Sequence, residues 1–533
     1  MKNSITALLL LFTLSAAAQP KNSAEPYGST ISSDDLKRHL YIIASPDMGG
    51  RGTGTRELEK AAMYIENHFS SLGLTPGNKG SYQYYYPLWQ DSIEQTSIRV
   101  NDIDFLQGRH FTISPRQSVT QAVNSNEIVF LGYGIDDPAY SDYKTTNVQG
   151  KIVFIVEGEP RKNDTAYIVT GTSKKSNWSF NTTLKLKAAV KNGASAVLVL
   201  QASFPKYNLE RKNSRTPFYP EFGITGEKNS INLYIVSDTL AAALLGEAML
   251  NEVKVKMKTG HLLTTQVVNK PVALNYSEAR FKTQTSNVVA VLPGTDLKDE
   301  YVIITAHMDH IGKRGDSVIY YGADDDGSGT CAVMEIAEAF TKAWKSGKGP
   351  RRSIIFMTVS GEEMGLWGSK FYVENPLYPL DKTTVNLNID MIGRIGNDYL
   401  KSATDTTKKG SPDSLNYVYV IGDDKLSSDL RPISEKSNKE YTQLKLDYKY
   451  NDPKDPNRFY YRSDHYNFAD KGVPILFYFN GVHKDYHRPT DTPDKINYDV
   501  YARRTQLVFY TAWDMANRDK MLKRDIPLNM PPR

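Results

Sequence analysis

Three short stretches in the second half of the chain combine imidazole and carboxylate groups with glycine-rich backbone. They are His307-Met308-Asp309, Ala323-Asp324-Asp325-Asp326-Gly327-Ser328-Gly329 and Ser360-Gly361-Glu362-Glu363. Adjacent aspartates repel one another, so a carboxylate triplet has little use as packing in a strand or helix. A pair of divalent cations would stabilise such a cluster. We therefore expect a hydrolase site that holds two metal ions.

The segments around these stretches alternate between buried strand and helix. Largely continuous apolar runs lie at residues 288–292, 302–306, 354–359, 385–389 and 475–479, and a helical pattern follows Gly329. Such runs are typical of central strands that are covered on both faces. The pattern predicts an α/β fold with a mixed, largely parallel central sheet flanked by helices. Sheets of this kind bind ligands at the carboxyl ends of their strands, where distant residues converge.

The candidate ligands follow these predicted strands. His307 comes directly after one strand and Asp390 after another, and Glu362 and Glu363 follow a third. Two cations about 3.5 to 4 Å apart need a bridging carboxylate, and each needs further histidine or carboxylate ligands. We expect Asp325 to be the bridge. His307 and Asp390 would then bind one ion, and Glu363 with a second histidine would bind the other.

Four histidines are candidates for the second histidine ligand, namely His310, His465, His483 and His487. We favour His487, which follows the 475–479 strand in a loop whose polar and proline content suits a positioned site residue. Tyr486 beside it is expected to donate its phenol hydrogen to the oxyanion of a tetrahedral intermediate.

Two carboxylates are expected to assist the metal ligands. Asp309 lies two residues after His307 and is predicted to accept the second ring N–H of that histidine, which would fix its tautomer. Glu362 adjoins Glu363 and cannot easily share its metal ion. We therefore interpret Glu362 as the general base that stands over the bound water.

Together these motifs resemble a known enzyme family, the zinc-dependent aminopeptidases of metallopeptidase family 28, which include vacuolar aminopeptidase Y and secreted bacterial leucine aminopeptidases. The resemblance rests on His-x-Asp, Ala-Asp-Asp-Asp-Gly-Ser-Gly, Gly-Glu-Glu-x-Gly, Asn-Ile-Asp-Met and a late Tyr-His, and spans roughly residues 285–517. It implies two Zn²⁺ ions as cofactors and Glu362 as the base. The five metal ligands that it implies are His307, Asp325, Glu363, Asp390 and His487.

The resemblance has three further implications. The Asp325–Asp326 peptide would be cis, and Asp324 and Asp326 would support the bridging carboxylate. The tyrosine before the final histidine polarises the substrate carbonyl in some members, which favours a catalytic role for Tyr486. The segments 132–135, 150–153 and 191–194 resemble a protease-associated domain, which is inserted in many relatives.

The length of 533 residues and the 40% apolar composition allow several domains. We expect a signal peptide at residues 1–18, an N-terminal part of the peptidase domain at 19–117, a mainly-β inserted domain at 118–263 and the zinc peptidase domain at 264–533. One helix, around residues 184–191, is expected in the inserted domain. The polar stretch 395–462 is longer than a compact family member would need.

The N-terminus and the composition bear on location and partners. Lys2, an apolar run at 5–14 and small residues at 15–18 predict a secretory signal that is cleaved after Ala18. The run is too short to span a bilayer, so we expect a periplasmic or extracellular protein without a stable membrane anchor. With 65 basic and 60 acidic residues and no dense basic block, nucleic acid is not an expected partner. Cys331 is the only cysteine, which excludes an intramolecular disulfide.

These observations predict a secreted two-zinc exopeptidase, most simply an aminopeptidase that acts on peptides with a free N-terminus. A carboxypeptidase or another zinc amidohydrolase is an alternative, and Arg394 or Arg462 would then hold a substrate carboxylate. A non-catalytic, receptor-like binding protein would be expected to have lost metal ligands, which are all present here. The run Ser463-Asp464-His465 suggests a serine nucleophile, but adjacent residues cannot readily adopt the triad geometry.

Overall fold

The structure is a computed structural model that describes residues 23–114, 118–204, 218–220, 230–315, 317–404 and 415–531. The chain divides into two compact units, of which the first combines Met1–Tyr86 with Gln284–Arg533 and the second is Pro87–Thr283. The predicted signal peptide, residues 1–18, lies outside the described residues. Within the described residues, no helix is long and apolar enough to cross a membrane.

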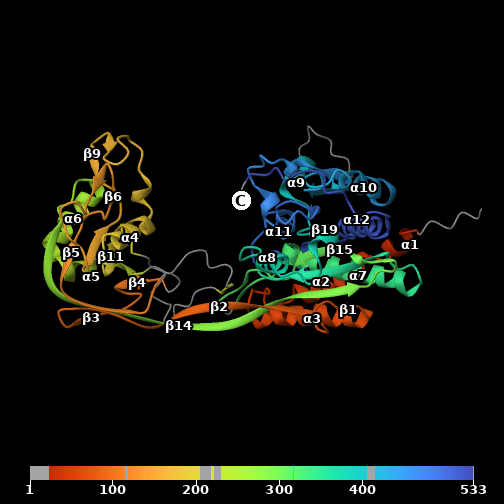
Figure 1. Ribbon diagram of the computed structural model, residues 1–533, viewed down its shortest axis with the longest axis horizontal. Coiled ribbons are helices and arrows are strands. Elements are labelled where there is room, and N and C mark those ends of the chain that lie inside the picture. Colours follow the sequence, from red (N-terminus) through yellow and green to blue (C-terminus); the bar gives the residue numbers. More distant parts are fainter. Residues whose placement is uncertain are drawn as a thin grey trace, which may run out of the picture. The chain divides into compact units, whose positions relative to one another are not determined.

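A mixed sheet forms the centre of the first unit (Figure 1). Its strand order is β21-β20-β22-β19-β15-β18-β14. The bounds are Lys445–Asp447 (β21), Tyr417–Ile421 (β20), Ile475–Phe479 (β22), Thr383–Ile389 (β19), Leu297–His307 (β15), Arg352–Val359 (β18) and Gln266–Leu292 (β14). The four strands β22, β19, β15 and β18 run parallel, whereas β14 and β20 are antiparallel to β18 and β22. The five predicted strands and the largely parallel sheet are therefore confirmed.

Helices cover both faces of this sheet. They are α2 (Ser33–Ile43), α3 (Arg56–Leu72), α7 (Gly329–Lys345) and α12 (Tyr498–Asn517) on one face, and α8 (Trp367–Glu374) and α11 (His465–Asp470) on the other. Successive side chains of a strand point to opposite faces. Val302 and Ile304 of β15 accordingly pack with the first group of helices, and Ile303 packs with the second. Burial on both faces explains why these strands read as continuous apolar runs.

The ends of the two N-terminal helices follow from local sequence. α2 begins after Ser32, whose hydroxyl accepts a hydrogen bond from the backbone N–H of Asp35. α3 begins after Thr55, which caps the helix in the same way, and ends at Gly73 with φ 82°. A hydroxyl at the start and a left-handed glycine at the end are the features that favour helix boundaries.

The second unit also combines sheet and helix. Its strands β5 (Gln121–Phe130), β8 (Ile152–Val156), β11 (Ala196–Leu200) and β13 (Asn232–Val236) are parallel neighbours in that order. Helix α4 (Thr182–Lys191) packs on one face, and α5 (Asp238–Leu245) and α6 (Glu247–Thr259) pack on the other. The expectation of a single helix in this block was wrong. Leu240, Leu244, Leu250 and Val253 supply the buried helical stripe that it overlooked.

The polar stretch 395–462 extends the sheet of the first unit. It contributes the edge strand β21 and its neighbour β20, together with α9 (Asn397–Thr404) and α10 (Leu430–Ser437). Residues 405–414 of this stretch lie outside the described part. A short 3-10 turn, Phe459–Tyr461, packs its aromatic rings into the same core as α8 and α11.

The loop between α2 and α3 holds a fully buried arginine. The guanidinium of Arg51 donates hydrogen bonds to the carbonyl oxygens of Met308 at 2.8 Å, Ile43 at 2.8 Å, Tyr321 at 2.9 Å and Gly322 at 2.8 Å. One side chain thus joins the N-terminal helices to the backbone that follows His307 and to the backbone that precedes the aspartate triplet.

Replacing Arg51 by methionine should destabilise the first unit, because four carbonyl oxygens, three of them at buried contacts, would each lose a hydrogen bond. We expect the free energy of unfolding to fall by more than about 3 kcal/mol, measured by urea unfolding with tryptophan fluorescence. Arg51→Lys keeps the charge but reaches fewer carbonyls, so its loss should be smaller. The exposed Arg56 provides the control, and Arg56→Met should unfold like the wild type. An Arg51→Met protein with wild-type stability would contradict the proposed role.

Candidate active site

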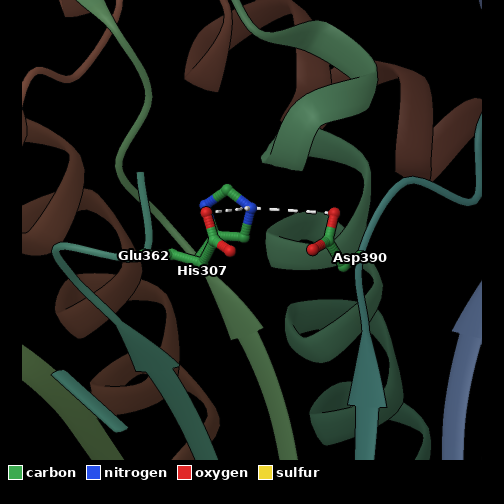
Figure 2. A group of neighbouring side chains, drawn as sticks. All are labelled: His307, Glu362 and Asp390. Carbon is green, nitrogen blue, oxygen red and sulfur yellow. Dashed lines mark ion pairs between the residues drawn. The ribbon is translucent and has the colours of Figure 1, made fainter. Parts of the chain in front are cut away.

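The first group of candidate ligands lies where three parallel strands end. His307 is the last residue of β15, Asp390 directly follows β19, and Glu362 lies three residues after β18. Nε2 of His307 is 3.7 Å from Oδ1 of Asp390 and 3.8 Å from Oε2 of Glu362. Figure 2 shows both contacts as dashed lines. The ligand atoms of the three residues lie within 4.8 Å of one another, so one ion can contact all of them.

A second group lies beside the first. Nε2 of His487 is 3.1 Å from Oδ2 of Asp325 and 3.2 Å from Oε2 of Glu363. His310 approaches the other oxygen of the same glutamate, with Nδ1 at 2.7 Å from Oε1 of Glu363. His310, Asp325 and Glu363 also offer ligand atoms within 4.8 Å of one another. Two histidines therefore converge on one glutamate.

Asp325 lies between the two groups. Its Oδ1 is 3.3 Å from Nε2 of His307, and its Oδ2 is 3.1 Å from Nε2 of His487. One carboxylate thus presents one oxygen to each group, which is the arrangement that a bridging ligand requires. The structure brings all five side chains that the resemblance implied as ligands into this cluster.

The other two aspartates of the triplet are bound by the protein itself. Asp326 accepts hydrogen bonds from the backbone N–H groups of Met391 at 3.0 Å and of His307 at 3.1 Å. Asp324 accepts a hydrogen bond at 2.7 Å from the backbone N–H of Gly393. The Asp325–Asp326 peptide is cis, as the resemblance implied. Only the middle carboxylate is therefore directed to both groups.

A further acidic residue fixes the triplet from behind. Oδ2 of Asp491 accepts hydrogen bonds from the backbone N–H groups of Asp324 at 3.0 Å and Asp325 at 3.2 Å. Sequence reasoning missed this role. Asp491 lies in the same polar loop as His487, but no spacing rule shows which carboxylate of a loop meets a distant backbone.

The remaining histidine candidates have other partners. His483 is buried behind the site, with Nε2 at 3.1 Å from Oδ2 of Asp324. His465 lies on α11, where Nε2 contacts the carbonyl oxygen of Tyr460 at 2.8 Å and the ring stacks on Phe477. Burial lowers the pKa of His465 to about 3, so it is a neutral packing residue.

Asp309 contacts the site in two ways. The nearest partner of Nδ1 of His307 is the backbone carbonyl of Asp309 at 3.1 Å, whereas its carboxylate is 3.7 Å away. The ring N–H of His307 is therefore closer to the backbone carbonyl of Asp309 than to the carboxylate that we expected as its partner. An N–H at Nδ1 leaves Nε2 unprotonated and able to bind a metal ion. The carboxylate of Asp309 accepts hydrogen bonds from the hydroxyl of Thr53 and the backbone N–H of Glu362.

A small cavity of about 30 Å³ opens at the cluster. Its lining residues are Asp325, Glu362, Asp390, Met391, Phe459, Arg462, Phe477, Phe479, Val482 and Tyr486. The ring of Tyr486 stacks on His487 with centroids 3.9 Å apart, and its hydroxyl accepts a hydrogen bond from Nη2 of Arg462 at 3.1 Å. The cavity thus combines site carboxylates, an apolar wall and a tyrosine–arginine pair.

Several buried atoms of the cluster make no hydrogen bond of regular geometry among the described residues, although they lie close to one another. They are Nε2 of His307, both ring nitrogens of His310, Oδ2 of Asp325 and Oε1 of Glu363. Buried polar atoms are normally satisfied, so a group of nitrogen and oxygen atoms that face one another without hydrogen bonds fits bound cations. The donor set of imidazole and carboxylate is one that zinc prefers.

The electrostatics of the cluster also call for positive charge. Burial raises the pKa of Glu362 well above its usual range, and the nearby carboxylates of Asp390 and Glu363 raise it further. Burial works against a charged His487, but Asp325 and Glu363 outweigh this effect and raise its pKa to about 10. Divalent cations would relieve the repulsion among these four carboxylates.

The Ser463-Asp464-His465 run forms no triad. Ser463 accepts a hydrogen bond from the side-chain amide of Asn388, and Asp464 accepts one from the hydroxyl of Ser369. His465 faces the aromatic core described above. Each residue therefore has a separate structural contact.

Comparisons with known proteins agree with this site. Residues 287–512 match the sequence model described as peptidase family M28. A probable zinc metalloprotease of Pyricularia oryzae is 26% identical over 279 residues, which cover 45% of this chain and 52% of that protein. A probable glutamate carboxypeptidase of Zea mays is 36% identical over 120 residues, which cover 22% of this chain and 16% of that protein. The chain thus matches about half, or less, of each relative's length.

The fold has a counterpart among solved structures. An aminopeptidase from Aneurinibacillus sp. strain AM-1 superimposes with a TM-score of 0.51 at 18% identity, over 96% of this chain and 100% of that one. This likeness shows a shared fold. The two groups of candidate ligands agree with the family match. Residues 287–512 are similar to peptidase family M28, and the candidate metal site lies within this matched region.

Proposed function

We propose that the protein is an exported aminopeptidase that uses two zinc ions to remove N-terminal residues from peptides. The observation that carries the proposal is the position of Asp325, which offers one oxygen to each of two groups of ligand atoms. The name of the Aneurinibacillus aminopeptidase, whose fold is similar, supports the aminopeptidase assignment.

The ligand assignment follows the distances. His307, Asp390 and one oxygen of Asp325 would hold the first ion. Glu363, His487 and the other oxygen of Asp325 would hold the second. When bound, the two ions supply Lewis acidity at the substrate carbonyl and the attacking water.

The side chains of the protein perform the proton transfers. Glu362 lines the cavity and lies close to the first group, so its carboxylate can take a proton from water and pass it to the leaving amine. Tyr486 can donate its hydroxyl hydrogen to the oxyanion, because its oxygen already accepts a hydrogen bond from Arg462. The backbone N–H of Glu362, held by Asp309, helps to fix the base.

A carboxypeptidase is the second candidate, since the maize relative carries that name. Of the two arginines that could hold a substrate carboxylate, Arg394 is already paired with Asp485 at 2.9 Å and lies 3.6 Å from Asp491. Arg462 lines the cavity. The position of the scissile bond relative to the free amine distinguishes the two activities.

Replacing Glu362 by glutamine should remove the base and leave the metal ligands in place. We expect kcat to fall by about 10²- to 10⁴-fold, while metal analysis still finds two zinc ions per chain. The exposed Glu374 at the end of α8 offers a matched control, and Glu374→Gln should keep wild-type kcat. A Glu362→Gln protein that retains most of its activity, or that loses its zinc, would rule out the assignment as base.

Blocking the substrate amine should abolish hydrolysis by an aminopeptidase. We expect leucine p-nitroanilide to be cleaved and N-acetyl-leucine p-nitroanilide to resist, measured by release of p-nitroaniline. A carboxypeptidase would instead cleave an N-acetylated dipeptide with a free carboxylate and spare its amide. That pattern would replace the aminopeptidase proposal.

Export is proposed from the N-terminal sequence alone. Expression of the full chain in a Gram-negative host should yield a processed protein outside the cytoplasm, because residues 2–18 have the charge and apolar pattern of a signal peptide. N-terminal sequencing should find Gln19 first. An intact Met1 on the cytoplasmic protein would contradict this prediction, whatever the peptidase activity.

A further inference from the structure

The cavity beside the candidate zinc site has one basic residue in its lining. Three of the lining residues carry a carboxylate. Arg462 is the only lysine or arginine among all the lining residues. The carboxylates belong to the proposed metal and proton chemistry. Arg462 orients the hydroxyl of Tyr486 through one N–H donor, which leaves most of its guanidinium without a role in that chemistry.

Two contacts hold the guanidinium of Arg462 in this wall. It lies over the ring of Phe459 at 4.7 Å from the centroid, and its Nη2 donates a hydrogen bond to the hydroxyl of Tyr486 at 3.1 Å. Because the ring of Tyr486 stacks on His487, this pair connects Arg462 to the candidate metal cluster through one intervening side chain. Stacking and hydrogen bonding orient a guanidinium that would otherwise move freely.

Among the described residues, no carboxylate contacts the side chain of Arg462. Within the described residues, its backbone N–H bonds to the carbonyl of Phe459, and its side chain contacts Phe459 and Tyr486. Arg394 differs in this respect, because Asp485 neutralises it at 2.9 Å. A guanidinium has five N–H donors in a fork that matches a carboxylate. In Arg462 one donor is engaged by Tyr486, and the side chain remains exposed to the cavity and solvent.

We propose that Arg462 binds a carboxylate of the substrate, so that the enzyme prefers peptides with a carboxylate close to the scissile bond. This inference rests on the proposed peptidase function and adds a substrate class to it. The carboxylate has two possible sources, an acidic side chain on the first residue or the C-terminus of a dipeptide. The neighbouring phenylalanines, Phe459, Phe477 and Phe479, would pack the aliphatic part of the substrate.

Two pairs of substrates test the proposal and separate the two sources. The first pair is glutamate p-nitroanilide and glutamine p-nitroanilide, which differ only in the side-chain charge. The second pair is Leu-Gly and Leu-glycinamide, which differ only in the terminal charge. In each pair, kcat/KM is measured for the wild type, Arg462→Gln and Arg462→Lys. We expect the wild type to prefer the charged member of one pair.

In Arg462→Gln that preference should fall by about 10- to 100-fold, as expected for the loss of a charged hydrogen bond. Arg462→Lys should retain part of it. The control is Arg503→Gln, which makes the same change at an exposed position of α12 outside the cavity lining and should keep the wild-type preference. The pair that responds identifies the source of the carboxylate.

A purely structural role of Arg462 through Tyr486 predicts a different result. It would lower kcat/KM for both members of each pair equally, and Tyr486→Phe would reproduce the effect. An equal loss in both pairs would therefore overturn the proposal, as would a wild type with no preference in either pair.

A binding measurement separates this inference from the proposed function. The four compounds are titrated calorimetrically into Glu362→Gln and into the double variant with Arg462→Gln. Weaker binding of only the charged member in the double variant supports the carboxylate contact even when no compound is hydrolysed by the wild type. A wild type that hydrolyses none of the four compounds would refute the aminopeptidase activity and leave the carboxylate contact of Arg462 standing. Equal affinities in the two proteins would refute the role of Arg462 alone.

Discussion

Repulsion among buried carboxylates is the constraint on which the rest of this structure depends. Asp325, Glu362, Glu363 and Asp390 lie within a few side-chain lengths of one another, and the two aspartates are buried while the two glutamates are mostly buried. Such a cluster is costly unless cations and hydrogen-bond donors compensate it. The parallel strands supply the geometry, because their carboxyl ends place distant residues at one edge. The two zinc ions of the proposal supply the positive charge.

The molecule assigns chemistry and recognition to different parts of the chain. The candidate ligands stand at strand ends and on a short, hydrogen-bonded turn, where backbone N–H groups and Asp491 hold the triplet in place. Arg462 and part of the apolar wall come from the stretch 395–462, which also adds strands β20 and β21 to the sheet. Loops of this kind can change with little effect on the sheet. A family of such enzymes can therefore vary its substrates while it keeps its metal site.

The sequence predicted the sheet and the cluster because both depend on patterns that are local in the chain. A continuous apolar run identifies a buried strand, and a charged residue directly after it must lie at the strand's end. Asp491 and Arg51 escaped prediction because their partners are backbone groups far away in the sequence, which no residue pattern marks. The same limit applies to Asp309, whose carbonyl rather than carboxylate is nearest to the imidazole. Helices α5 and α6 have apolar residues at helical spacing, but we overlooked this pattern because short strands surround them in the sequence.

The hydrogen bonds of Arg51 have a consequence for the order of biosynthesis. During translation this arginine leaves the ribosome about 270 residues before Tyr321 and Gly322, whose carbonyl oxygens it binds. The whole second unit, Pro87–Thr283, is made in between and can fold first, since domains generally fold as units in the order of synthesis. The guanidinium of Arg51, which is buried in the folded protein, therefore stays exposed until the strands of the first unit have been synthesised. The candidate metal site can therefore assemble only after this late closure, when the chain is nearly complete.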